Sequence, residues 1–181
     1  MEPCSNKQNT EEVNLKQISF FKNEKNFDTR GFFLKILDSE AIENFTVRDI
    51  FLSESKKGTI RGMHFQTGRC ATDRIIVVLE GAILDVTVDL RVGKGFGKET
   101  FLKIDAKKNP GMLFVPKGYA HGFQVLSKKA KVLYITNSKH CKKHDTGFNP
   151  RSITKAWPVE KIIMSDRDNK LPTLTSRMKI H

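Results

Sequence analysis

The sequence has few cysteines, one tryptophan and no long apolar run, and these shortages exclude several classes of protein. Its 181 residues include three cysteines, Cys4, Cys70 and Cys141, which lie far apart and form no Cys-x-x-Cys pair. We therefore expect neither a disulfide framework nor a zinc site, and a reducing cytoplasm is favoured. No stretch approaches the roughly 20 apolar residues of a membrane span, and residues 1–14 lack the apolar core of a signal peptide. A soluble protein without a membrane partner is expected.

The charge is strongly positive, and it predicts an anionic partner. Lys and Arg total 32 against 20 Asp and Glu, a formal net charge of +12. Such an excess attracts polyanions and phosphates. The basic residues are nevertheless spread in pairs, without an RNP-type aromatic motif, a zinc finger or a recognition-helix pattern, so we expect no nucleic acid. A phosphate-bearing small molecule accounts for the charge, and a basic surface that serves solubility alone is the alternative.

Short strands separated by turns dominate the chain. Residues 1–16 are expected to form a flexible tail, and residues 17–181 a single domain long enough to bury a core. In residues 82–91, Leu84, Val86, Val88 and Leu90 alternate with polar side chains, which indicates one packed face and one polar face. Short helices are expected at 38–44 and after Ser165, which can cap a helical turn. Strands are expected at 18–22, 30–37, 46–52, 74–79, 82–91, 99–104, 112–115, 119–126 and 130–136, with polar turns at 23–29 and 53–58. This pattern predicts an all-β double-sheet jelly roll.

The strand and turn pattern resembles the cupins, so a metal site has to be considered. Metal-binding cupins use a His-x-His pair, a following Glu and a His from a second motif. Here His64 is followed by Gln66 where the second His would stand, while Pro116-x-Gly118-x-x-His121 resembles the second motif. Two imidazoles without a carboxylate make a poor metal site. We expect a cupin-type double-stranded jelly roll with no metal and no cofactor.

Without a metal, the polar residues indicate proton transfer. Arg61 and His64 stand three residues apart in the segment 58–66. Taken alone, they are more typical of a surface charge and a hydrogen-bonded structural histidine than of an active site. Histidine suits a general base because its pKa lies near neutrality, and an aspartate on its other nitrogen fixes the tautomer. A tyrosine can return a proton from another direction, and nearby cations stabilise an enolate. Such a set describes an epimerase.

Four motifs, in order, resemble the dTDP-4-dehydrorhamnose 3,5-epimerases. They are residues 30–33 (Arg-Gly-Phe-Phe), 58–66 (Gly-Thr-Ile-Arg-Gly-Met-His-Phe-Gln), 81–91 and 115–123, and the likeness runs from about residue 20 to 168. The resemblance implies a metal-free homodimeric cupin that acts on nucleotide-linked 4-keto-6-deoxy sugars. It also implies that the enzyme inverts C3, C5 or both by removing a proton next to the C4 ketone, in deoxysugar and surface polysaccharide biosynthesis.

The resemblance also assigns roles by position. It implies that His64 is the general base, Asp168 its partner and Tyr134 the acid on the opposite face of the sugar. Arg61 and His121 match residues that contact the keto sugar, and Arg30 matches a cation for the diphosphate. The expected substrate-binding residues are Arg30, Lys35, Asp49, Phe51, Arg61, Arg74, His121, Asp145 and Arg167.

Several positions depart from the family's pattern. Arg74 stands where the family usually has lysine, and it is larger, planar and differently directed. Lys35 replaces a glutamate, Asp49 and Phe51 replace the ends of a Gln-x-Asn segment, and Lys139 lies near the place of a base-stacking aromatic. Two alternatives stay open: a single-centre 3-epimerase or keto-isomerase of the same fold, and a non-catalytic cupin that binds a sugar nucleotide.

Four of these departures predict that the ligand differs from the family's usual one away from the reacting carbon. They are Lys35, Asp49, Phe51 and Lys139. We expect a base other than thymine or a differently built sugar, because these positions concern nucleotide recognition. Titration of the purified protein with a panel of nucleoside diphosphates measures the preference. A clear preference for the thymidine form would contradict the hypothesis.

Overall fold

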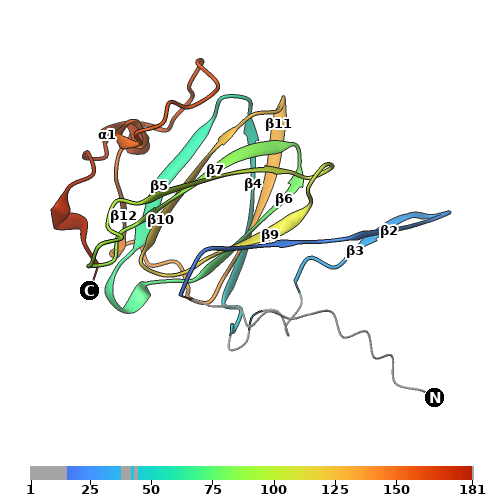
Figure 1. Ribbon diagram of the computed structural model, residues 1–181, viewed down its shortest axis with the longest axis horizontal. Coiled ribbons are helices and arrows are strands. Elements are labelled where there is room, and N and C mark those ends of the chain that lie inside the picture. Colours follow the sequence, from blue (N-terminus) through green and yellow to red (C-terminus); the bar gives the residue numbers. More distant parts are fainter. Residues whose placement is uncertain (1–15, 38–41, 43–44, 181) are drawn as a thin grey trace.

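The fold is a flattened barrel of two antiparallel sheets with a hairpin that extends away from it (Figure 1). The computed structural model describes residues 16–37, 42 and 45–180. The tail expected at 1–16, apart from Lys16, and nearly all of the helix expected at 38–44 lie outside these residues. The division into tail and single domain stays a prediction.

The first sheet has the strand order β1-β9-β6-β11-β4 and the second the order β12-β5-β10-β7-β8. Two facing five-stranded antiparallel sheets confirm the predicted all-β jelly roll. The strands of the first sheet are β1 (Ser19–Lys22), β9 (Gly111–Val115), β6 (Arg74–Glu80), β11 (Lys129–Thr136) and β4 (Asp49–Lys56). Those of the second are β12 (Asp145–Gly147), β5 (Ile60–Gln66), β10 (Tyr119–Val125), β7 (Ala82–Asp89) and β8 (Glu99–Asp105).

Helices are few and short in the described part of the chain. They are α1 (Asp166–Lys170) and the 3-10 turns η1 (Gly68–Cys70), η2 (Pro150–Ser152) and η3 (Ser176–Met178). Ser165 caps α1 as predicted, because its Oγ accepts a hydrogen bond from the Asp168 backbone N–H at 3.1 Å. None of these helices has the length and apolarity to cross a membrane.

The alternating pattern of β7 predicted one packed face and one polar face, but both faces of this strand are largely buried. Asp85, Thr87 and Asp89 are only 1%, 2% and 6% exposed. They share the inward face of β7 with Ile83, which packs between the two sheets. The outward face, including Val86 and Val88, is covered by residues of the chain beyond β12. Polar groups are therefore built into the barrel interior.

Three segments differ from expectation. Residues 53–56 form part of β4 instead of a turn, because they continue the antiparallel ladder with β11, where Glu54 also pairs with Lys129 and Lys131. Residues expected as a turn at 23–29 contain β2 (Lys25–Asp28), which pairs with β3 (Gly31–Leu34). No strand is expected at β12, which adds an edge strand beside β5. The polar composition of all three segments gave no indication of a strand.

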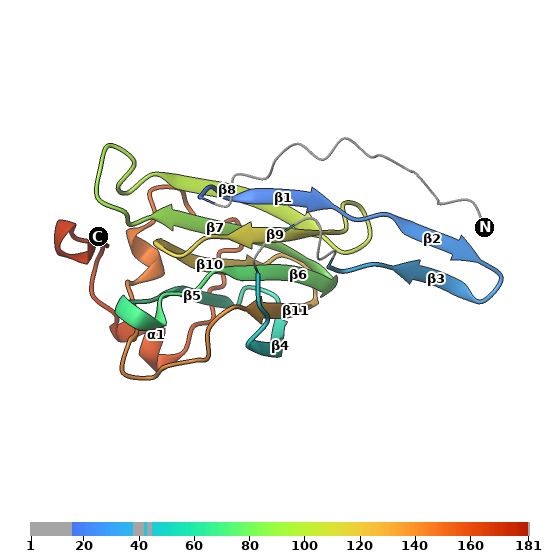
Figure 2. The same ribbon diagram turned by 90° about the horizontal axis from the view of Figure 1, so that it is seen from below.

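The β2–β3 hairpin stands clear of the barrel in both views (Figures 1 and 2). Its tip carries Arg30, and its faces carry Phe27, Phe32 and Phe33, which are 75%, 56% and 67% exposed. Within one chain nothing buries these phenylalanines, and such exposed apolar area on a two-stranded ribbon is typical of a surface that another molecule covers. We call residues 25–34 the arm.

Candidate functional site

A cavity of about 740 Å³ opens at one end of the barrel. Strands of both sheets line it, and the segment that leads into α1 closes one side. Nine of the twelve expected site residues line this cavity: Phe51, Arg61, His64, Arg74, His121, Tyr134, Asp145, Arg167 and Asp168. The volume suits a small-molecule ligand.

A histidine and an aspartate form a close pair on the cavity wall. His64 Nε2 lies 2.7 Å from Asp168 Oδ1, although β5 and α1 are distant in sequence. Burial opposes ionisation of Asp168, but the hydrogen bond and charge of His64, with help from the Gly62 N–H and Ser165, outweigh it and hold the pKa of this carboxyl below its ordinary value. The carboxylate accepts the proton on Nε2, so Nδ1 is the nitrogen that can act as a base.

A second histidine–aspartate pair lies deeper in the barrel. His121 on β10 is the register partner of His64 on β5, which brings the two rings to the same region of the sheet. Its Nε2 lies 2.7 Å from Asp85 Oδ2, and the two side chains are only 4% and 1% exposed. Asp85 thereby fixes the orientation of the His121 ring toward the cavity. A buried pair of this kind rigidifies the wall.

Tyr134 comes from the opposite sheet. It lies on β11, and its ring stacks on Phe51 of β4 with 4.7 Å between centroids and an interplanar angle of 12°. The His121 ring meets it edge-on at 6.5 Å. Burial raises the pKa of Tyr134 to about 12, so its hydroxyl stays protonated at neutral pH and can donate a proton.

Arginines supply positive charge around these groups. Arg74 Nη1 donates a hydrogen bond to the backbone carbonyl of His64 at 3.3 Å, which ties β6 to β5 beneath the pair. Burial lowers the pKa of Arg74, yet a guanidinium keeps its proton in proteins. Arg61 donates to Ser55 Oγ at 2.8 Å. At the rim, Arg167 pairs with Asp145 at 2.7 Å. The arrangement suits an anionic ligand.

Three expected residues lie outside this cavity. Arg30 is at the tip of the arm, where its guanidinium pairs with Asp28 at 2.5 Å, and Lys35 follows the arm's second strand. Asp49 begins β4, and its Oδ2 accepts the His140 backbone N–H at 3.1 Å, which joins β4 to the loop after β11. The arm carries Arg30 away from its own barrel, so its role as a cation for the diphosphate stays a prediction.

The prediction of site residues missed Asp85, the partner of His121. Its signal was present in the sequence as a carboxylate in the middle of a strongly apolar strand, a position where an unpaired charge is costly. Sequence also did not show that Thr72, Ser138, His140 and the segment 163–165 line the cavity. These contacts depend on loops and turns that have no periodic pattern.

The fold and the cavity define a cupin-type protein equipped to move protons, with one His–Asp pair on one sheet and a protonated tyrosine on the other. The chain matches the model of the family described as dTDP-4-dehydrorhamnose 3,5-epimerase across residues 12–176. It belongs to this family.

Relatives and solved structures agree with this membership. The dTDP-4-dehydrorhamnose 3,5-epimerase of Escherichia coli K12 is 35% identical over 162 residues, which cover 84% of this chain and 87% of the relative. The crystal structure of the Bacillus anthracis epimerase, with TDP and PPi bound, has a TM-score of 0.83 and 33% identity and covers 90% of this chain and 97% of that one. ChmJ, a 3'-monoepimerase from Streptomyces bikiniensis in complex with dTDP-quinovose, has a TM-score of 0.80 and 25% identity, with coverage of 86% and 83%.

The lowered pKa of Asp168 predicts a specific dependence of stability on pH. Its folded-state pKa lies below the unfolded value of about 4, so its contribution to stability is complete above that value and is lost as the pH falls through the folded one. Asp168→Asn should lower the free energy of unfolding by about 1–3 kcal/mol at neutral pH, and the difference from wild type should shrink in acid.

Urea denaturation across this pH range measures the difference. Asp166→Asn is the control, because it removes an exposed carboxylate from the same helix. Its stability curve should run parallel to that of wild type. A wild-type advantage over Asp168→Asn that stays constant down to strongly acid pH would contradict the account.

Proposed function

We propose that this protein epimerises a nucleotide-linked 4-keto-6-deoxy sugar by proton transfer next to the C4 ketone. The observation that carries the proposal is the His64–Asp168 pair on one sheet and the protonated Tyr134 on the other, around one cavity. A base and an acid on different walls suit removal of a proton from one face of a carbon and its return to the other.

In the proposed reaction, His64 Nδ1 takes the proton from the carbon beside the ketone, and the C–H electron pair moves into an enolate. Asp168 stabilises the imidazolium that forms. The guanidinium groups of Arg61 and Arg74 stabilise the negative oxygen. Tyr134 then gives its proton to the other face of the carbon, and the charges of the imidazolium and the tyrosinate are neutralised by exchange of a proton through solvent.

The nature of the substrate follows from family membership and from the relatives. The bacillary relative holds TDP, and the streptomycete relative holds a dTDP sugar. A cavity lined by arginines agrees with a diphosphate-bearing ligand, and deoxysugar biosynthesis for surface polysaccharides is the corresponding pathway class. A cytoplasmic location stays a prediction that rests on cysteine usage.

Inversion at a single centre is the second candidate. Likeness to a 3'-monoepimerase favours it, and so does Arg74 in place of the usual lysine, since a bulkier planar cation beside the ring restricts how the sugar turns between two proton transfers. The joint presence of His64, Asp168 and Tyr134 in one cavity argues against a non-catalytic sugar-nucleotide binder, which has no need of all three.

Exchange of substrate hydrogen with deuterated water tests the proposal. Wild type should wash deuterium into C3, C5 or both, and His64→Asn should reduce this exchange by about 10²–10⁴-fold because it removes the imidazole that Asp168 orients as the base. Tyr134→Phe should reduce inversion by about 10²-fold or more while exchange that depends on His64 persists. Mass spectrometry and NMR of the recovered sugar report both quantities.

Tyr119→Phe is the matched control, since Tyr119 contacts Arg91 away from the cavity. It should keep both exchange and inversion. Exchange by His64→Asn at the wild-type rate would overturn the assignment of the base, and binding without any exchange by wild type would favour the non-catalytic alternative.

We further propose that the protein works as a homodimer in which the arm lies on a second copy. Support comes from the exposed Phe27, Phe32 and Phe33, and from the exposed apolar residues Ile50 and Leu52 on β4, an edge strand of the first sheet. In such a dimer Arg30 and Lys35 would be delivered to the partner's cavity, where a cation for the diphosphate is useful.

Light scattering during size-exclusion chromatography tests the dimer. Wild type should have twice the mass of one chain, and the double variant Phe27→Ser/Phe33→Ser should shift toward the monomer, because each substitution removes buried apolar area from the proposed interface. Leu79→Ser, which changes an exposed apolar residue on the barrel, is the control and should stay dimeric. A monomeric wild type would contradict the proposal.

A further inference from the structure

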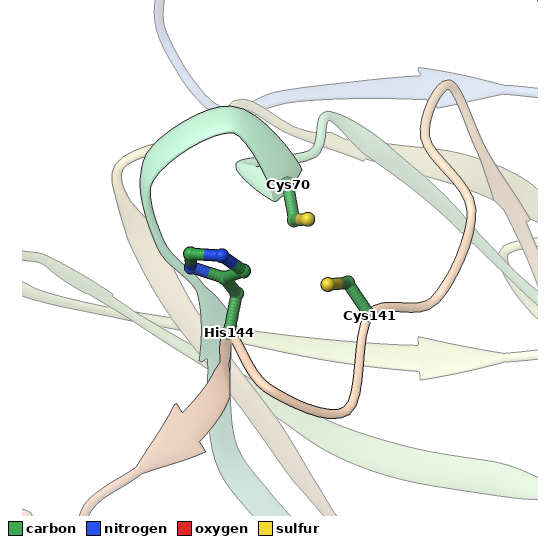
Figure 3. A group of neighbouring side chains, drawn as sticks. All are labelled: Cys70, Cys141 and His144. Atoms are coloured by element: carbon green, nitrogen blue, oxygen red, sulfur yellow. The ribbon is translucent and has the colours of Figure 1, made fainter.

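Three metal-binding side chains gather beside the cavity, although the reaction proposed above uses none of them. Cys70 ends η1, and Cys141 and His144 lie on the loop between β11 and β12. Their ligand atoms all lie within 4.8 Å of one another. Figure 3 shows the two sulfurs directed toward each other with the imidazole beside them. Two thiols and one imidazole form a ligand set that zinc prefers.

We propose that Cys70, Cys141 and His144 bind one zinc ion at the edge of the substrate cavity. Tetrahedral zinc with Zn–S bonds of about 2.3 Å and Zn–N bonds of about 2.0 Å places its ligand atoms about 3.5–3.8 Å apart. The observed spacing is at most 4.8 Å, so small side-chain rotations close it around the ion. Cys70 is only 9% exposed, but Cys141 and His144 are half-buried, so solvent can reach the fourth position with a water molecule.

The backbone already holds the three ligands in place. The His144 N–H donates to the Cys141 carbonyl at 2.9 Å, which forms the turn that brings these two side chains together. The Thr67 N–H donates to the His144 carbonyl at 3.0 Å, and the Cys70 N–H donates to the Thr67 carbonyl at 3.2 Å. The loop and η1 are thus joined, so metal binding needs to order little further backbone and costs little additional conformational entropy.

Gly68 lies beside the imidazole. A Cβ at this position would lie 3.6 Å from His144 Nδ1, an ordinary van der Waals distance, so the backbone conformation and not lack of space favours glycine here. Gly68 also has φ +56°, in the left-handed region where a side chain is disfavoured. The turn between β5 and η1 therefore combines a tight backbone with a place for the third ligand.

Metal binds the thiolate form of cysteine, and the surroundings favour that form at Cys141 only: the hydrogen bond to Cys141, and then burial, raise the pKa of the Cys70 thiol. A hydrogen bond from the Cys70 thiol lowers the pKa of the Cys141 thiol. Burial opposes this shift, while the backbone N–H groups of His144 and Lys143 support it. The geometry of the cluster stands without this effect, which only makes the first deprotonation easier.

Such an ion would act on the cavity through the loop that it fixes. The Cys141 N–H donates to Gln66 Oε1 at 2.7 Å, and Gln66 lines the cavity. His144 directly precedes Asp145, which lines the cavity and pairs with Arg167. The ion would therefore clamp the end of β5 to the start of β12. This proposal departs from the expectation of no zinc site, which considered only cysteines close in sequence.

Cobalt provides a spectroscopic probe of the site. The full-length protein, reduced and treated with a chelator, should bind one Co²⁺ per chain and develop a thiolate-to-cobalt charge-transfer band with the visible absorption of tetrahedral cobalt. Zn²⁺ should displace the cobalt and raise the midpoint of thermal unfolding, because a ligand that binds the folded state stabilises it. Cys141→Ser, Cys70→Ser and His144→Gln should bind at least about 100-fold more weakly, the upper end of the loss caused by removal of an outer-shell partner.

His140→Gln is the matched control, because His140 is an exposed imidazole on the same loop but does not belong to the cluster. It should keep the cobalt spectrum unchanged. Wild type without a charge-transfer band would overturn the proposal, as would a spectrum that survives both cysteine substitutions. Loss of thiols in air with no metal binding would show a Cys70–Cys141 disulfide instead, and would equally overturn it. None of these results depends on epimerase activity.

Discussion

The hydrogen bond between His64 and Asp168 is the interaction on which the rest of the site depends. It joins β5 to α1 and requires that the chain beyond β12 return to the mouth of the barrel. Backbone hydrogen bonds fix this return: Ile60 N–H donates to the Ile163 carbonyl, and Ile163 N–H donates to the Gly58 carbonyl. A Cβ on Gly58 would lie 2.1 Å from the Lys161 carbonyl oxygen, so the close approach needs glycine.

The barrel interior is divided between a packed core and a polar cavity. Ile83 on β7 and Phe123 on β10 belong to the apolar part, whereas Asp85 and His121 on the same two strands support and line the polar part. Buried ionisable groups are costly unless they are paired. Both histidines of the site meet an aspartate at 2.7 Å, so each carboxylate has a partner and each ring has a fixed orientation.

Sequence patterns predicted the jelly roll and most of the cavity, because strand alternation and the motifs at 58–66 and 115–123 are local signals. They failed where tertiary pairing decides the outcome. Residues 53–56 have the polar composition of a turn, but they pair with β11, where Glu54 forms ion pairs with Lys129 and Lys131. The role predicted for Arg30 stays a prediction: the pairing of β2 with β3 places this residue at the tip of the arm, outside its own cavity. Cys70 and His144 are adjacent only because β12 pairs with β5.

If Asp168 holds the proton of His64 on Nε2, Nδ1 is free to act as the base. Nitrogen-15 NMR of histidine-labelled protein, above the pH at which imidazole titrates, distinguishes the two tautomers. Nε2 of His64 should have the shift of a protonated nitrogen and Nδ1 that of an unprotonated one, and Asp168→Asn should remove this preference. A proton on Nδ1, or an equal mixture of the two tautomers in the wild-type protein, would contradict this assignment.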